Sequence, residues 1–173
     1  SIGDLMKAVN LTHGGFYGHF ASRDDLIAAA LDKALSEGEK SSIKAGARKG
    51  TRTLKSIANS YLSRTHRDNP GSGCAVSALA GDVDRSSRKN REIMSKHLAK
   101  YFENIRDVIG DQRNEQLAIA IMSMMVGAVT LSRVMSDPAI ADKVLLVARN
   151  AILELGSSSN SETSKETAHA RAQ

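Results

Sequence analysis

The sequence has few aromatic residues, few prolines and one cysteine, and each shortage excludes something. Its 173 residues include three Tyr, three Phe and no Trp, so a sizeable core must consist of aliphatic residues and methionine. The single cysteine, Cys74, excludes an intramolecular disulfide framework and fits a reducing cytoplasm, where we expect the protein to act. Only two prolines, Pro70 and Pro138, interrupt long runs rich in Ala, Leu, Lys and Arg. Since these four residue types favour helices, we predict an all-α protein.

Long hydrophobic runs and charge blocks of a single sign are also lacking. No run of about 18 apolar residues is present, and the nearest candidate, 117–135, is broken by Ser123, Arg133 and other polar or small residues. We therefore expect no membrane span, and no signal peptide is visible. The net charge of +5 is compatible with a polyanionic partner. Helical periodicity is already running at Ile2, so we expect further residues upstream of Ser1.

Half of the aromatic residues gather near the N-terminus, at Phe16, Tyr17 and Phe20. Phe16 and Phe20 are four residues apart, so on a helix they share one face and can be buried together. Tyr17 and His19 then point elsewhere, which leaves a polar face on the same short helix. A helix with one anchoring face and one hydrogen-bonding face suits a role in a groove.

Two short helices are predicted around this cluster, over 2–9 and over 12–18. Ser1 and Thr12 are placed to cap their N-termini. Asn10 lies between the two helices and tolerates the left-handed backbone conformation that a tight turn requires. Two helices joined by a turn of three or four residues form the helix-turn-helix pattern.

The second of these helices is rich in glycine. Gly14, Gly15 and Gly18 each cost about 1 kcal/mol relative to alanine in a helix interior. Two explanations are open. The missing side chains allow the backbone to approach another surface closely, or they allow tight packing against a neighbouring helix.

The remainder of the chain also carries helical patterns. Ser22 and Asp25 form a capping-box pair that opens a third helix, which we expect to end near Lys40. Further helices are predicted from about 42 or 53 to 67, and over 74–84, 87–109, 114–135 and 139–155, with a loop over 68–73. The predicted organisation is a helix-turn-helix domain over 1–40, a larger helical domain over 41–155, and a disordered polar tail over 156–173.

The last two predicted helices are apolar on more than one side. A terminal hairpin cannot bury two faces against one small domain, whereas two hairpins paired in a dimer form a four-helix bundle. We therefore expect a homodimer. Its predicted interface residues are Val126, Val129, Val144, Ala148 and Ile152.

The N-terminal residues resemble the DNA-binding domain of tetracycline-repressor (TetR) family regulators. The similarity covers roughly residues 1–35 and is carried by the segments Ile2–Leu5, Val9–Phe20 and Ser22–Leu26. Asn10 stands where the family often has glycine, and Arg23 stands where lysine is frequent. The family's first helix, which packs behind the helix-turn-helix, has no counterpart in this sequence.

The resemblance implies that 12–19 is a recognition helix that enters the major groove of DNA. The amides at its N-terminus are then expected to meet phosphates and base edges. Tyr17 and His19 are expected to contact phosphates, although the alternative is a partly buried polar pair that braces the third helix. The expected DNA-binding residues are Ser1, Thr12, His13, Gly14, Gly15, Tyr17, His19 and Arg23.

The family resemblance also implies a ligand cavity among the C-terminal helices. Its occupation would change the spacing of the two DNA-binding units, and a small apolar or amphipathic effector suits its walls, although each candidate could equally be ordinary core. The candidates are Tyr61, His66, Met94, His97, Leu98, Tyr101, Phe102, Met122 and Met125. Cys74 is either a thiol sensor or a small buried residue. From the majority behaviour of the family, we expect a repressor released by the effector from a palindromic operator.

Catalytic chemistry has no support in the sequence. His13 and His19 are six residues apart, too far round a short helix to share a metal ion easily. No catalytic triad, catalytic carboxylate pair or glycine-rich phosphate loop can be assigned, so we expect neither an enzyme nor a cofactor. Two rivals to a regulator remain open: a helical ligand-binding or dimerisation module that does not bind DNA, and a small helical enzyme. The presence of Tyr17, His19 and Arg23 favours the regulator.

Overall fold

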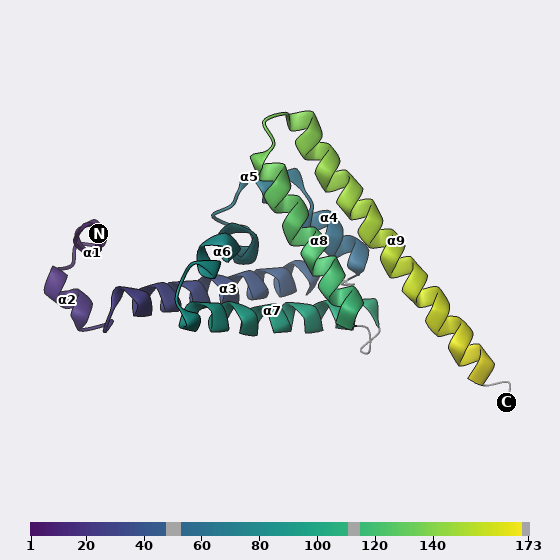
Figure 1. The fold of residues 1–173 in the computed structure, drawn as a ribbon, viewed down its shortest axis with the longest axis horizontal. Helices are drawn as coiled ribbons and strands as arrows, with labels where there is room; N and C mark the ends of the chain where they lie inside the picture. The colour runs from purple at the N-terminus through teal and green to yellow at the C-terminus, as the bar shows by residue number, and fades with distance from the viewer. Residues whose placement is uncertain (48–52, 111–114, 171–173) are drawn as a thin grey trace.

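The computed structural model describes residues 1–47, 53–110 and 115–170, and these ranges contain helices and no strand (Figure 1). The prediction of an all-α protein is therefore confirmed. The helices are α1 (Ile2–Ala8), α2 (His13–Tyr17), α3 (Arg23–Ala47), α4 (Leu54–Tyr61), α5 (Arg64–Asp68), α6 (Ala75–Asp84), α7 (Arg88–Ile109), α8 (Glu115–Val134) and α9 (Pro138–Ala170).

Helices α1 and α2 lie at one end of the molecule, beyond the N-terminal end of α3 and far from the hairpin of α8 and α9 (Figure 1). This end has a small core of its own, in which Met6, Phe16 and Ala28 are buried. The main hydrophobic cluster begins at Leu31 and does not include these three residues. We call residues 1–28 the head.

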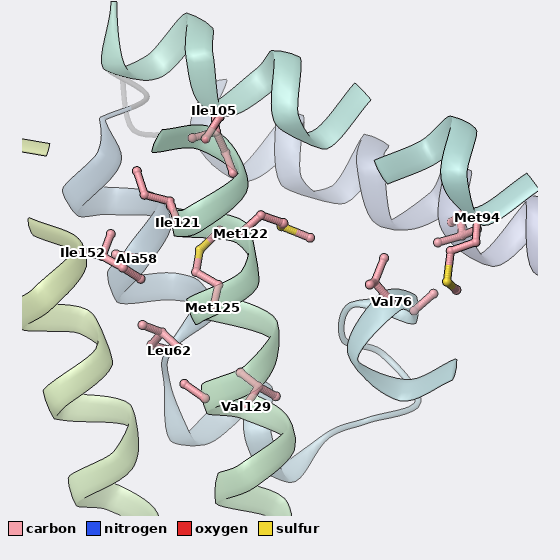
Figure 2. Packing of buried hydrophobic residues seen from close by; sticks show 14 of the residues in the cluster. Ala58, Leu62, Val76, Met94, Ile105, Ile121, Met122, Met125, Val129 and Ile152 are labelled. Carbon is pink, nitrogen blue, oxygen red and sulfur yellow. The ribbon is translucent and has the colours of Figure 1, made fainter. Parts of the chain in front are cut away.

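The other helices surround the main cluster. Helices α3 and α7 lie side by side and α6 packs on both, while α8 contacts α5, α6, α7 and α9. Figure 2 shows Met125 of α8 on the side of Leu62 and Ile152, whereas Met94 of α7 lies with Val76 of α6. The core is aliphatic and methionine-rich, as the shortage of aromatic residues requires.

Helix starts follow the capping residues that the sequence contains. Side-chain oxygens accept hydrogen bonds from amides three residues later at Ser1 (3.2 Å), Thr12 (3.1 Å), Ser22 (3.1 Å), Thr53 (3.1 Å) and Ser87 (3.4 Å). Each such bond satisfies an amide that the helix itself leaves unpaired. Gly110 ends α7, as predicted, with a φ of 73°.

One predicted helix is two helices in the structure. A single helix ending at Arg67 was expected from the sequence, but α4 and α5 are separated at Leu62, whose φ is −92° and ψ is 44°. Ser63 begins α5 by accepting a hydrogen bond from the amide of His66 at 3.1 Å. Serine occurs both at helix N-caps and within helices. The spacing of apolar residues therefore did not reveal that α4 ends and a new helix begins here.

Two helices extend beyond their predicted ends. Helix α3 continues to Ala47, so the predicted boundary at residue 40 falls inside it. Helix α9 continues to Ala170, so the prediction of a disordered tail is wrong for 156–170, while 171–173 lie outside the described residues. Beyond Gly156 the sequence has no proline, and extending an existing helix fixes one residue for each new hydrogen bond, which costs far less than nucleation.

Helix α8 is, within the described residues, the one helix long and apolar enough to cross a membrane by length and composition. A helix at the centre of a core meets the same criteria, and α8 contributes Ile121, Met125 and Val129 to the main cluster. Packing in the core therefore explains why this side of α8 is apolar. The opposite side of α8 is the one that could contact a second protomer.

Candidate nucleic-acid interface

The turn between α1 and α2 is built by hydrogen bonds to the end of α1. Asn10 has a φ of 56°, the left-handed conformation predicted for it, and its amide donates to the carbonyl of Lys7 at 3.2 Å. The amide of Leu11 donates to the carbonyl of Met6 at 2.8 Å. This pair of bonds is a Schellman motif, and it fixes the direction in which the chain leaves α1 for α2.

Helix α2 has one buried face and one exposed face. Phe16 is 1% exposed, and its ring lies 5.1 Å from Tyr17, edge to face, and 5.7 Å from Phe20 between ring centroids. The prediction that Phe16 belongs to the core is confirmed. Tyr17 is 58% exposed, and His19 is also exposed. Both side chains are therefore accessible to solvent.

The glycines of α2 have no packing reason inside the protein. A Cβ added at the exposed Gly14 would meet no atom within 4 Å. A Cβ at Gly15 would lie 3.4 Å from the Thr12 hydroxyl oxygen, and one at Gly18 would lie 3.4 Å from the Gly15 carbonyl oxygen, both ordinary contact distances. Within the described residues, no neighbouring helix requires these glycines. Tight packing against a neighbouring helix, one of the two explanations, is therefore not supported.

The N-terminus of α2 faces the same exposed side. Thr12 caps it, and its hydroxyl oxygen accepts a hydrogen bond from the amide of Gly15 at 3.1 Å. Because the first amides of a helix have no partner within it, those of His13 and Gly14 can bind an anion. The side chain of His13 lies outside the part of the chain that the structure describes.

Two further predicted phosphate contacts differ in their surroundings. Arg23 is exposed at the first residue of α3. Ser1 caps α1, and its hydroxyl group donates to the Asp4 carboxylate at 2.7 Å. The hydrogen bond from Ser1 lowers the pKa of Asp4, so this carboxylate stays ionised and competes with a phosphate for Ser1. Arg23 is the better placed of the two.

The start of α3 is anchored to α7 by its acidic residues. The Asp24 carboxylate accepts a hydrogen bond from the side-chain amide of Asn90 at 3.0 Å, and Asn90 is fully buried. The Asp25 carboxylate pairs with the Lys89 ammonium, whose hydrogen bond is the main cause that lowers the pKa of Asp25. Sequence reasoning missed Lys89 and Asn90 because they lie more than 60 positions from their partners.

The nine predicted cavity residues are spread over α4, α5, α7 and α8. Met94, His97, Met122 and Met125 are buried, and the remaining five are partly buried. Figure 2 shows Met94 apart from Met125. The ring nitrogens of His97 contact side chains of α3. An open hollow of about 390 Å³ lies elsewhere and is lined by Thr53, Lys55, Ser56, Asn59 and Ser60.

Tyr61, His66 and Cys74 do come together. The rings of Tyr61 and His66 lie edge to face at 4.4 Å, and His66 Nε2 accepts a hydrogen bond from the amide of Cys74 at 2.8 Å. The ring proton therefore lies on Nδ1, 2.6 Å from the Tyr61 carbonyl, and burial lowers the pKa of His66. The buried Tyr61 hydroxyl lies near Cys74 and Ser77 but makes no well-formed hydrogen bond to any described residue.

The outer side of the hairpin of α8 and α9 is apolar. Residues 116–132 contain no charged side chain. The exposed hydrophobic residues of the two helices and their connection are Ile119, Leu131, Val134, Met135, Ile140, Leu146, Val147 and Leu155.

Two of the predicted dimer-interface residues are wrong. Val129 and Ile152 are 0% exposed, because they pack inside the protomer's own core. Val126, Val144 and Ala148 are partly buried against the same core. The side of the hairpin that is available to a partner is therefore a different one from the side chosen from the sequence.

Comparisons with known proteins do not assign this chain to a family. No protein-family model matches it, and no curated protein matches it. The evidence for function therefore lies in the N-terminal residues and in the geometry of the head.

Proposed function

We propose that this protein is a DNA-binding transcriptional regulator whose helix α2 enters the major groove. The exposed face of α2 carries the proposal, because Gly14 has room for a side chain that it lacks. Omitting that side chain costs a helix roughly 0.5–1 kcal/mol, which close approach to a partner offsets. The resemblance of residues 1–35 to TetR-family regulators points to duplex DNA as that partner.

The groups around α2 are proposed to make two kinds of contact with DNA, one with phosphates and one with bases. The amides at the start of α2, together with Tyr17, His19 and Arg23, are proposed to bind phosphates, which position a protein without specifying sequence. Thr12 and His13, at the tip of the helix, are proposed to meet base edges in the groove. The anchored start of α3 holds these groups in a fixed arrangement.

A homodimer follows from the outer side of the hairpin. Ile119, Ser123, Gly127 and Leu131 recur every four residues and form a stripe along α8, with small residues at its centre. A Cβ at Gly127 would meet nothing within 4 Å, so the protomer does not require this glycine. We propose that two hairpins pair along this stripe, giving a two-fold dimer that reads a palindromic operator.

The proposed effector site is the surroundings of the buried Tyr61 hydroxyl, which include His66 and Cys74. A buried hydroxyl without a hydrogen bond costs roughly 1–3 kcal/mol, so a ligand that satisfies the Tyr61 hydroxyl gains that contact. The surrounding core is apolar. A small amphipathic molecule with one hydrogen-bonding group therefore suits the site, and its binding would separate α4 from α6 and release a repressor from DNA.

The phosphate contacts give a direct test. The double variant Tyr17→Phe with His19→Ala is expected to weaken binding to every DNA sequence by about tenfold and to flatten its salt dependence, since phosphate contacts act independently of sequence. Fluorescence anisotropy over a range of salt concentrations, with an operator and an unrelated duplex, measures both effects.

A matched control removes a cation far from the head. Lys55→Ala alters an exposed lysine on α4 and should leave both duplexes bound as before. A loss confined to one DNA sequence would mean that Tyr17 and His19 contact bases and not phosphates.

A further inference from the structure

The contact between α3 and α7 contains a buried histidine held by two carboxylates. His97 is 2% exposed, with its Nε2 atom 2.9 Å from Asp32 and its Nδ1 atom 2.5 Å from Glu39. Asp32 and Glu39 are seven residues apart, so they lie on one side of α3, two turns from each other. Within the described residues, no group of three such side chains could hold a metal ion, so these contacts are hydrogen bonds.

We propose that His97 is a proton-dependent latch, which holds α3 against α7 when the imidazole is protonated and releases it when the proton is lost. Ionised carboxylates only accept hydrogen bonds, so both ring nitrogens must carry hydrogen to bond both of them. A neutral imidazole has one N–H group. Its other nitrogen would then face a carboxylate oxygen, acceptor against acceptor, and that hydrogen bond would be lost.

The pKa of the Asp32 carboxyl lies below its ordinary value. The hydrogen bond from His97 is the main cause that lowers the pKa of Asp32, and Lys96 and Lys100 on α7 lower it further. Lys100 also lies 3.6 Å from Glu39. Asp32 thus contributes stability above the ordinary carboxyl range near pH 4, and this contribution is lost as the pH falls through its lower folded value. On the alkaline side, the latch is lost with the proton of His97.

Among the described residues, the groups that the neighbouring helices place near this contact do not supply the same response. On α7, burial raises the pKa of Tyr101, so its hydroxyl stays neutral and donates to the Leu35 carbonyl at 3.4 Å. Helix α8 has no charged residue over 116–132. On α4, burial also raises the pKa of Tyr61. The ionisable residues of α4 and α6 that remain are the exposed Lys55, Asp82 and Asp84 and the partly buried Cys74.

The latch is placed to control the head. Asn90 and Lys89 hold the first turn of α3, and His97 holds its middle. When the contact at His97 opens, α3 stays anchored near the head but becomes free to move along the rest of its length. The position of the head relative to the other helices then changes. The effect on DNA rests on the proposed function, whereas the latch itself does not.

Amide hydrogen exchange in the full chain tests the latch. Exchange is compared at about pH 5.5 and about pH 9, on either side of the ordinary histidine pKa of about 6.5. After correction for intrinsic exchange rates, protection of the middle of α3 should fall at least about tenfold at the higher pH. Nitrogen NMR of the ring should show both nitrogens of His97 protonated at the lower pH.

Variants separate the latch from general stability. His97→Gln cannot donate to both carboxylates and should abolish the pH response. Asp32→Asn alters a side chain that is 61% exposed, so the fold is kept, and its amide can donate to the neutral ring, which should weaken the response. Asp84→Asn, which removes an exposed carboxylate of α6, should retain the full response. The matching DNA measurement is the change in operator affinity over the same pH range, which Asp32→Asn should reduce.

Three results would overturn the latch: α3 protection that does not change with pH, an unchanged response in Asp32→Asn, or a neutral His97 ring at every pH. If His97→Gln does not fold, Asp32→Asn and the ring NMR still decide the question. A latch that titrates in a protein that binds no DNA at any pH would uphold the latch and refute the proposed function.

Discussion

Leu131→Glu is expected to convert the proposed dimer into folded monomers. Leu131 is 53% exposed in the protomer, so a charge there does not enter the protomer's own core. In a two-fold interface the substitution occurs twice, and each buried, unpaired carboxylate costs at least about 3 kcal/mol. The dimer dissociation constant should therefore rise by roughly 10⁴-fold, as 6 kcal/mol corresponds to more than four decades. Sedimentation velocity across a concentration series measures it.

The position of the introduced charge decides whether the variant tests assembly alone or folding as well. Val126 and Val144 pack against the protomer's core, so a charge there would test folding together with assembly. Ala80→Glu, on an exposed position of α6, is the matched control and should leave assembly unchanged. If Leu131→Glu sediments as the wild-type dimer does, the outer side of α8 is not the interface. Circular dichroism establishes that the variant remains helical.

Gly14→Ala should make the protein more stable and a weaker DNA binder. Alanine stabilises a helix by roughly 0.5–1 kcal/mol relative to glycine, and the added methyl group meets nothing inside the protein. On DNA the same methyl group would stand between the α2 backbone and the groove. We expect at least about a tenfold loss of affinity, equivalent to about 1.4 kcal/mol. Thermal unfolding and anisotropy measure the two effects.

Gly81→Ala is the matched control for this variant. Gly81 is also exposed within a helix, and a Cβ there would also meet nothing within 4 Å, but it lies on α6, away from the head. It should gain stability without any change in DNA binding. Equal DNA affinity in both variants would show that Gly14 does not approach DNA, and the glycine argument for the interface would fail.

The features that could be predicted from the sequence are those made by neighbours in the chain. Ser1, Thr12 and Ser22 each accept a hydrogen bond from the amide three residues later, so the local pattern reveals these helix starts. Asn10 was predicted to adopt its left-handed conformation for the same local reason. Phe16 could be assigned to the core because the spacing of aromatic residues defines one face of a short helix.

Contacts between distant segments could not be predicted. His97 binds Asp32 and Glu39, which lie 65 and 58 positions earlier, and nothing in either helix alone indicates the pairing. Val129 and Ile152 were assigned to the wrong side for a related reason. When a helix is apolar on two sides, its sequence does not say which side meets its own protomer and which side meets a partner.

Selection of bound duplexes from a random DNA pool tests the central proposal most directly. The folded chain, at low salt, should enrich a palindrome whose half-sites are separated by about one helical turn or a multiple of it, since two heads related by a two-fold axis read the same groove. Recovery of no enriched sequence by a folded dimer would contradict a DNA-binding role and would favour a helical ligand-binding or dimerisation module.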